Sequence, residues 1–496
     1  MKKPFIKRAS FWISVIVALS VIFLTVQIIR INILPANYMF GIVSFIYGFA
    51  LLGIGLANFS QNTLVKIMAY LVCANVFIVS SFGSYFLSKT ILTLHEVAEP
   101  IHTTSDDKTI RFVKAFSLND FSEKTVEDMN GQTVGILRNH SREQVDTCVE
   151  KIKQEKGINF TLREYDSSIE MMNNLKGKVI DFIIIDEPYL TTIEDYSGYE
   201  DIVDHLYELY AYDYKVTNKD VTKTEVDVTN TPFTVLISGS DSRIGLEEVT
   251  RSDVNMVLVV NPNINTLLMI SIPRDYYVET ACDASLGCAN GKMDKLTHTG
   301  LHGIGTTEAT IEKFLDIDIN YNATVTFDTV TQLVDALGGI TIGNSQEVEL
   351  DGFLYEVGNI KVNGKQALRY ARERKSYASG DRQRGRNQMA VVKGIVNKML
   401  SKQLLMNFGG IMDAVAGTFR TNLSVKDMTR LVNKQISEMK SWKIYQISLD
   451  GSNGTDFAYE LGDNASVMYP NEETIHKAQL DIQAMFNGET PPFKNE

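Results

Sequence analysis

The chain has 496 residues, of which 44% are hydrophobic and 22% are charged, and its formal net charge is -12. This hydrophobic fraction is sufficient to build packed cores, and the length beyond the N-terminal region predicts two folded units. The negative net charge argues against a general nucleic-acid-binding protein and predicts no nucleic-acid partner, although a local basic cluster can still bind one phosphate-bearing ligand.

The N-terminal region contains three long apolar stretches, at residues 11–29, 38–57 and 64–87. Each stretch is near the ~20 residues that a helix needs to cross a bilayer. A cleaved signal peptide has one short apolar core, so three successive stretches indicate a retained anchor over residues 1–88. We therefore expect a three-span membrane anchor, and the lipid membrane is the first predicted partner.

Basic residues flank the first stretch unequally: Lys2, Lys3, Lys7 and Arg8 precede it, whereas the loop after it has only Arg30. Because basic flanks stay in the cytoplasm, the N-terminus is predicted to be cytoplasmic. Three crossings then place everything after the anchor outside the cell. The alternative is a two-span hairpin with a buried third helix and a cytoplasmic body.

Residues 107–214 alternate between short apolar strands and helical patterns, which predicts a small extracellular α/β accessory domain. Its segments VEDMNGQTVGIL and NNLKGKVIDFIIIDEP resemble one lobe of an extracellular solute-binding protein. Asp186 and Glu187 follow its last buried strand, where we expect a solvated turn. The polar residues 215–231 are predicted to form a linker.

Two of the four cysteines, Cys282 and Cys288, lie six residues apart. Outside the cell this pair can close a small disulfide-bonded loop, and two free thiols are the alternative. No second pair of Cys or His residues has the spacing of zinc ligands, so we expect no zinc site.

Three apolar segments, at residues 233–239, 254–261 and 266–272, predict three strands, and the intervening Asn-Pro-Asn-Ile-Asn predicts a hairpin between the last two. In an antiparallel meander, the end of the first strand, the start of the second and the end of the third share one edge of the sheet. That edge would collect three charged pairs: Asp241 with Arg243, Arg251 with Asp253, and Arg274 with Asp275.

Carboxylates beside arginines suit a particular kind of ligand. Mg²⁺ prefers a few carboxylates and completes its shell with water and phosphate oxygens, and arginine binds phosphate through two parallel hydrogen bonds. Asp241 and Asp253, each beside an arginine, therefore predict a site for a divalent cation and a phosphate. Surface loops with satisfied salt bridges are the alternative explanation for any one such pair.

A basic run follows further along the chain. Its seven cations are Arg369, Arg372, Arg374, Lys375, Arg382, Arg384 and Arg386. The run enters a predicted helix over residues 382–399, where Arg384 and Gln388 are four apart on one face. A solvated face is the usual explanation for a charge run. So many like charges are nevertheless costly to cluster unless an anion neutralises them, and a phosphate-rich ligand would do so.

Six segments, GSDSR, RSD, ISIPRD, DKLTHTG, YARER and GDRQRGRNQ, occur in this order between residue 233 and about residue 400. In these segments the chain resembles the LytR-CpsA-Psr (LCP) family. The resemblance implies a catalytic domain over residues 232–486, built as an α-β-α sandwich around a mixed sheet, with an apolar pocket for a polyprenyl chain. The expected fold class is therefore α/β, with three transmembrane helices and an α/β accessory domain preceding this domain.

The resemblance also implies roles for individual residues. Asp241 and Asp253 would hold Mg²⁺ or Mn²⁺ and, with Arg274, would be catalytic. The residues that would bind the substrate are Arg243, Arg251, Arg372, Arg374, Arg384 and Gln388.

Two assignments stay open at this point. Arg386 and Asn387 intervene before Gln388, so the sequence leaves undecided whether Arg384 or Arg386 faces the ligand. No general base is assigned, and His298 is expected to fix its loop through a hydrogen bond.

The implied activity is the transfer of a glycan, expected to be capsular polysaccharide, from undecaprenyl pyrophosphate to peptidoglycan, with pyrophosphate hydrolysis as a side reaction. The enzyme would act at the plasma membrane of a Gram-positive bacterium, beside other capsule-assembly proteins. The alternative is a non-enzymatic regulator or binder of lipid-linked precursors. A serine hydrolase is not expected, because Ser238 and Ser240 have no His and Asp arrangement visible in the sequence.

Overall fold

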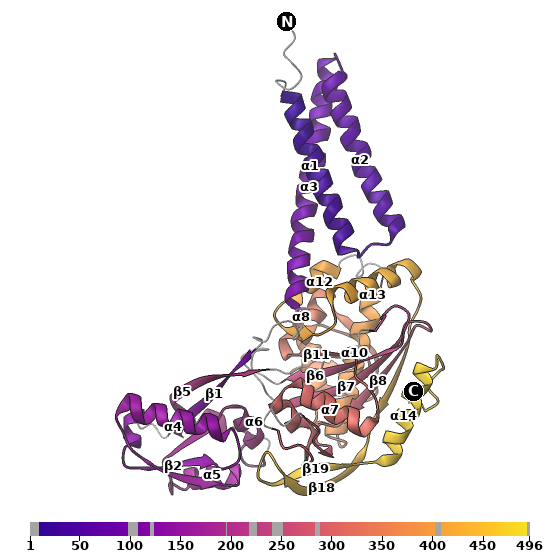
Figure 1. The fold of residues 1–496 in the computed structure, drawn as a ribbon. Helices are drawn as coiled ribbons and strands as arrows, with labels where there is room; N and C mark the ends of the chain where they lie inside the picture. Colours follow the sequence, from indigo (N-terminus) through magenta and orange to yellow (C-terminus); the bar gives the residue numbers. More distant parts are fainter. Residues whose placement is uncertain are drawn as a thin grey trace.

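The computed structural model describes residues 9–97, 108–119, 124–194, 196–217, 226–240, 251–282, 288–401 and 408–493. In these residues the chain forms a helical stalk (9–97), a small α/β unit (108–217), which we call the accessory unit, and a large α/β domain (226–493). The stalk stands on the large domain, and the accessory unit flanks that domain away from the stalk (Figure 1).

The stalk consists of α1 (Ala9–Ile31), α2 (Ala36–Phe59) and α3 (Thr63–Val97), each long and apolar enough to cross a membrane. Large apolar side chains such as Phe40 and Phe59 are exposed on these helices, by 75% and 81% respectively. Such a surface suits hydrocarbon better than water. The three predicted apolar helices are therefore confirmed.

The last turns of α3 extend beyond the predicted span and pack on the large domain, where α12 (Phe408–Val415) lies against them. Thr93 Oγ1 donates to Asp413 Oδ1 at 2.6 Å, and Lys89 Nζ lies 3.2 Å from Asp413 Oδ2. Leu94 is completely buried in a hydrophobic cluster that includes Ile411 of α12. The stalk and the large domain thus share one core, which restrains how they move relative to each other.

The accessory unit contains a five-stranded sheet in the order β3-β2-β4-β1-β5. Its strands are β1 (Lys108–Leu118), β2 (Thr133–Leu137), β3 (Thr161–Tyr165), β4 (Phe182–Asp186) and β5 (Leu206–Thr217). Its helices are α4 (Arg142–Lys156), α5 (Ser168–Lys176), α6 (Pro188–Glu194) and the 3-10 turns η2 (Val126–Met129) and η3 (Ile202–His205). The sequence did not predict β5, which pairs antiparallel with β1 and continues into the segment expected to be a linker.

One expectation for this unit is wrong. Asp186 does not lie in a solvated turn but is 1% exposed at the end of β4. Its Oδ2 accepts hydrogen bonds from Ser141 at 2.5 Å and Tyr214 at 2.7 Å, and Arg111 Nη2 lies 3.7 Å away. A buried carboxylate requires such partners, and the sequence did not show them because they come from three separate elements.

The large domain is built on a six-stranded sheet in the order β16-β11-β6-β7-β8-β17. Its strands are β6 (Phe233–Ser240), β7 (Ser252–Asn261), β8 (Thr266–Ile272), β11 (Tyr321–Val325), β16 (Phe419–Thr421) and β17 (Lys443–Ser448). β6, β7 and β8 form the predicted antiparallel meander, whereas β11 and β17 pair parallel to their neighbours. The expected mixed sheet is therefore confirmed.

Helices cover both faces of this sheet, as the α-β-α sandwich requires. Apolar residues of α7 (Ile304–Leu315) and α14 (Glu472–Phe486) pack on one face, and those of α10 (Asp381–Met399) pack on the other. The helices α8 (Phe327–Ala336), α9 (Gly364–Arg372) and α13 (Val425–Glu438) share a further cluster with α12 and α3. The remaining short elements are β9 (Tyr277–Glu279), β10 (Met293–Lys295), the 3-10 helix η5 (Leu296–His302), β12 (Ile340–Asn344), β13 (Val348–Leu350), β14 (Phe353–Tyr355) and β15 (Gly358–Val362).

A hairpin of the large domain, β18 (Gly451–Ala458) and β19 (Asp463–Pro470), reaches the accessory unit with its tip. Ser168 donates to the Leu461 carbonyl through both its backbone N–H, at 3.2 Å, and its hydroxyl, at 2.8 Å. Gly462 has a φ of 69°, and a Cβ there would overlap the carbonyl oxygen of Asp166. The tip is therefore fitted closely to the accessory unit.

This fit predicts that Gly462→Ala destabilises the protein more than Gly488→Ala, whose φ of 78° is similar but whose surroundings are open. Both changes incur about 1–2 kcal/mol for a left-handed L-residue, and Gly462→Ala adds about 1–3 kcal/mol of steric overlap. Differential scanning fluorimetry of the full chain in detergent should show a Tm for Gly462→Ala that is about 2–4 °C or more below the Tm of Gly488→Ala. Equal shifts for the two variants would contradict the close fit.

Candidate active site

The charged pairs predicted for one edge of the sheet are placed there by strand pairing. Ser240, the last residue of β6, pairs with Ser252 at the start of β7, and Ile272, the last residue of β8, pairs with Asn255. Asp253 is therefore next to the residues that follow β8. Of the predicted site residues, Asp241 and Arg243 lie outside the described residues.

Asp253 is surrounded by positive charge. Arg274 Nη1 donates to its Oδ1 at 2.7 Å, and Arg251 Nη2 lies 3.8 Å from its Oδ2. Both arginine side chains are buried, with 7% and 6% of their surface exposed. Thr297 Oγ1 also donates to Oδ1, at 3.0 Å. One carboxylate thus faces two guanidinium groups in a poorly solvated place, where charges interact strongly.

A third guanidinium reaches the same region from the first turn of α10. Burial lowers the pKa of Arg384, and repulsion from Arg274 and Arg374 lowers it further, against the opposing effect of Asp381 and Asp253. The Arg384 Nη2 lies 2.6 Å from Asp381 Oδ1. A group whose charged form is disfavoured in this way is stabilised by an anionic ligand.

These residues line a cleft of about 490 Å³. Four of the predicted site residues lie in its wall: Asp253, Arg274, Arg384 and Gln388. Arg251 is connected to this wall by its contact with Asp253, at 3.8 Å. Arg372 and Arg374 are exposed and are not part of this lining in the residues that the structure describes, and the Arg372 guanidinium lies 4.3 Å from the centre of the Phe327 ring.

The geometry favours Arg384 over Arg386 as the residue that faces the ligand. Arg386 also lines the cleft, but its Nε donates to Gln383 Oε1 at 2.8 Å and its Nη2 to Ser379 Oγ at 2.9 Å. These bonds direct its guanidinium along the start of α10. Arg384, in contrast, interacts electrostatically with both Arg274 and Asp253.

A divalent cation would find only part of its ligand set in the described residues. Asp253 is the one predicted metal ligand among them, and no three His, Cys, Asp or Glu side chains in the described ranges lie together so that they could hold a metal ion. Mg²⁺ commonly binds through one or two carboxylates, substrate phosphates and water. Asp253 fits that pattern if Asp241 supplies a second carboxylate, so Mg²⁺ stays a prediction.

His298 is fixed inside the domain. It is 2% exposed, and its Nδ1 lies 2.6 Å from Asp294 Oδ1. The neighbouring Lys295 forms an ion pair with Asp275, with its Nζ 2.6 Å from Asp275 Oδ1. The arrangement of His298 agrees with the expected loop-fixing hydrogen bond and gives it no access to the cleft.

Comparison with known proteins assigns the chain. The model of the LytR_cpsA_psr family matches residues 196–481, which is more than half of the chain. The chain belongs to the LytR_cpsA_psr family. This confirms the resemblance found in the six sequence segments.

Several relatives of this LytR_cpsA_psr protein have established names. It is 34% identical, over 49% of this chain and 77% of the relative, to the polyisoprenyl-teichoic acid–peptidoglycan teichoic acid transferase TagU of Bacillus licheniformis. It is 32% identical, over 53% of this chain and 84% of the relative, to the TagU of Enterococcus faecalis. Among solved structures, Bacillus subtilis TagU matches with a TM-score of 0.40 and 29% identity, over 52% of this chain and 97% of that one.

Part of the cleft of this LytR_cpsA_psr protein was not predicted. Its wall also includes Gln446, Ser448, Asp450 and Thr474, none of which is among the predicted site residues. Asp450 Oδ1 lies 2.6 Å from Arg382 Nε. The available signal was the alternation of polar and apolar residues between Lys443 and Ser448, but the place of this segment beside β8 follows only from the parallel pairing of β17.

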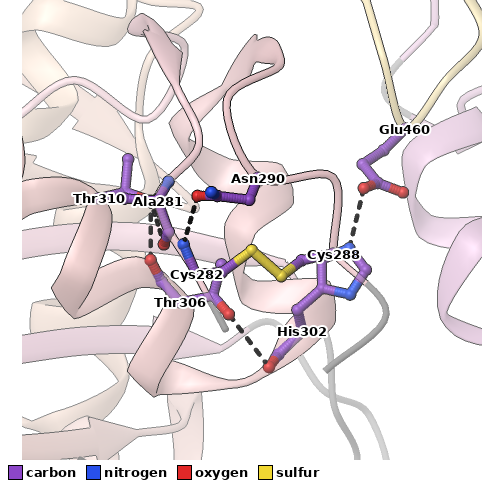
Figure 2. The surroundings of a disulfide bond; sticks show 8 residues. All are labelled: Ala281, Cys282, Cys288, Asn290, His302, Thr306, Thr310 and Glu460. Carbon is purple, nitrogen blue, oxygen red and sulfur yellow. Dashed lines mark hydrogen bonds and ion pairs between the residues drawn. A yellow bond between two sulfur atoms is a disulfide. The ribbon is translucent and has the colours of Figure 1, made fainter. Parts of the chain in front are cut away.

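The loop between β9 and β10 is closed by a disulfide between Cys282 and Cys288 (Figure 2). Hydrogen bonds brace the loop: the Cys282 N–H donates to Asn290 Oδ1 at 3.1 Å, and the Ala281 N–H donates to Thr310 Oγ1 at 3.1 Å. The loop leads directly into β10 and η5, which carries Thr297 to the cleft. The disulfide therefore stabilises the loop that precedes β10 and η5, the helix that contains Thr297.

The geometry of the cleft predicts that Arg384→Met weakens binding of geranylgeranyl pyrophosphate by about 10–100-fold, the equivalent of ~1.5–3 kcal/mol for hydrogen bonds to a charged group. The Tm of the ligand-free variant is measured alongside to show that it is folded. Isothermal titration calorimetry measures the binding. The matched variant Arg386→Met should bind within about threefold of the parent. A larger loss for Arg386→Met than for Arg384→Met would contradict the assignment.

Proposed function

We propose that the protein is a membrane-anchored phosphotransferase that attaches a polyprenyl-pyrophosphate-linked glycopolymer to peptidoglycan. The observation that carries this proposal is the cleft in which Asp253 faces Arg251, Arg274 and Arg384. Its cluster of three poorly exposed arginines suits a pyrophosphate. The names of the TagU relatives, which are glycopolymer transferases to peptidoglycan, support the same activity.

The reaction follows from positioning and charge neutralisation. The guanidinium groups of Arg274 and Arg384 hold the two phosphates, and Asp253 keeps Arg274 in place. A wall sugar hydroxyl attacks the phosphorus nearer the glycan and forms a new P–O bond, and its proton passes to water. The bond to the bridging oxygen breaks, and undecaprenyl phosphate leaves with its electrons. Phosphoryl transfer of this kind requires no covalent nucleophile on the protein.

A bound Mg²⁺ would add to this neutralisation of phosphate charge. Asp253, together with Asp241, would hold it. Without the metal, Asp253 accepts a hydrogen bond from Arg274. Water in place of the sugar hydroxyl would convert the same chemistry into pyrophosphate hydrolysis.

The polymer is proposed to be a capsular polysaccharide. The names of the relatives specify teichoic acid, so the two polymers are the donors to compare. Both donors would carry their glycan on undecaprenyl pyrophosphate. In this proposal the arginines contact the phosphate groups and not the sugar, so they would accept either donor. The acceptor sugar belongs to peptidoglycan, and other capsule-assembly proteins are proposed as partners.

We also propose that the stalk spans the plasma membrane of a Gram-positive bacterium, with the N-terminus in the cytoplasm and both α/β units outside. The apolar helices and their basic N-terminal flank support this topology. The Cys282–Cys288 disulfide supports it as well, because such bonds persist in oxidising compartments. The packing of α3 on α12 would then hold the cleft near the outer leaflet, where the lipid-linked donor lies.

The transfer reaction is tested with the purified full chain in lipid nanodiscs, a lipid-linked donor and peptidoglycan oligomers. Asp253→Ala and Arg274→Ala should each lower the rate of transfer by about 100-fold or more, because each removes a charge that positions or neutralises the phosphates. Arg163→Ala, an exposed arginine on β3, serves as the control and should retain the parental rate.

Parental rates for Asp253→Ala and Arg274→Ala would show that the cleft is not the transfer site. Donor binding without transfer by the parent would favour the non-enzymatic binder. Release of free polymer phosphate in place of wall-linked polymer would identify hydrolysis as the main reaction. Capsular and teichoic acid donors are supplied in separate reactions to decide between the two polymers.

A further inference from the structure

The 3-10 helix η5 contacts the two residues at the centre of the cleft through a single residue, Thr297. Thr297 donates its hydroxyl to Asp253 Oδ1 at 3.0 Å and its backbone N–H to the Arg274 carbonyl at 2.8 Å. Thr297 is completely buried. It therefore fixes the carboxylate of one proposed catalytic residue and the main chain of the other.

The position of η5 is in turn set by Asp294, which is 3% exposed. Its Oδ1 lies 2.6 Å from His298 Nδ1 and accepts the Lys295 N–H at 2.7 Å. Its other oxygen, Oδ2, accepts the backbone N–H of Glu460 at 2.7 Å. Asp294 thus joins the start of η5 to the tip of the β18–β19 hairpin.

Glu460 joins both α/β units. It pairs with His302 (Figure 2), with its Oε1 2.9 Å from His302 Nε2. Its Oε2 lies 3.5 Å from His140 Nδ1 of the accessory unit. Burial alone would raise the pKa of Glu460, but the neighbouring His302, His140 and His298 outweigh it and lower the pKa to about 2. Glu460 therefore stays ionised inside the interface.

Further contacts enclose the same junction. Arg111 of β1 donates to the Leu301 carbonyl at 3.0 Å, and Leu301 is completely buried in the hydrophobic cluster of the accessory unit. The His140 ring stacks on Tyr189 of α6, with ring centres 4.7 Å apart. The end of η5 is thus held by the accessory unit, while its start holds the cleft.

We propose that Thr297 is a positioning residue for Asp253, and that the accessory unit sets the position of Thr297 through Glu460 and η5. This inference rests on the proposed function. The Thr297 hydroxyl and Arg274 both bind Oδ1, so they fix the rotation of the carboxylate. A misplacement of about 1 Å at such a site lowers a rate by about 100-fold.

The first test compares three variants of the full chain in the transfer assay. Thr297→Val keeps the shape of the side chain but removes the hydroxyl, and it should lower kcat by about 10–100-fold. Its KM and its affinity for geranylgeranyl pyrophosphate should stay within about threefold of the parent, since Thr297 acts on Asp253 and not on the ligand. Thr297→Ser restores the hydroxyl and should recover most of kcat.

Thr299→Val is the matched control. Thr299 is an equally buried threonine of η5, but its hydroxyl donates to the Leu296 carbonyl at 2.7 Å and not to Asp253. It should alter the Tm without the selective loss of kcat. Parental kcat in Thr297→Val, failure of Thr297→Ser to recover activity, or an equal kcat loss in Thr299→Val would overturn the positioning role.

The second test asks whether the accessory unit acts through Thr297. Glu460→Gln alone should lower kcat by about tenfold, and adding it to Thr297→Val should cause no further loss, because the two residues act in series. Losses that multiply in the double variant would overturn the connection. If Glu460→Gln does not yield folded protein, His140→Gln takes its place in the same cycle.

Failure of this inference is distinguishable from failure of the proposed function. A parent that binds geranylgeranyl pyrophosphate but transfers no polymer contradicts the transferase, whatever the variants do. A parent that transfers polymer at the same kcat as Thr297→Val contradicts only the positioning role.

Discussion

The contact between Asp253 and Arg274 holds the charged groups of the cleft at one edge of the large-domain sheet. It joins the start of β7 to the second residue after β8. Arg251 lies near the same carboxylate, and Arg384, which interacts with Asp253, also pairs with Asp381 at 2.6 Å. Buried like charges are unfavourable without a counterion. On the proposed function, the cleft is preorganised for an anion, and a bound phosphate recovers free energy lost by placing these arginines together.

This arrangement depends on parts of the chain that lie far apart in sequence. The sheet edge supplies Asp253 and Arg274, α10 supplies Arg384, and β17 and the β18–β19 hairpin close the wall. The same hairpin touches the accessory unit at its tip, and α3 shares a core with the large domain. The stalk and the accessory unit both pack on the domain that contains the cleft, so the proposed membrane position and the proposed chemistry are physically linked.

Much of the architecture could be predicted because its signals are local. Apolar length gave the stalk helices, and the alternation of strands and turns gave the β6-β7-β8 meander. Pairings between distant segments could not be read in this way: β5 against β1, β17 beside β8, and the partners that bury Asp186. Thr297 was missed for the same reason, since its proposed role depends on a contact with Asp253 that the sequence segment DKLTHTG does not reveal.

The most direct measurement is an experimental structure of the full chain in a nanodisc with geranylgeranyl pyrophosphate bound. We expect both phosphates in the cleft, with oxygens within hydrogen-bonding distance of Arg274 and Arg384 and the prenyl chain leading away from them. A pyrophosphate bound elsewhere, with the side chains of Asp253, Arg274 and Arg384 unchanged and without a ligand, would contradict the central claim that this cleft is built to hold a lipid pyrophosphate.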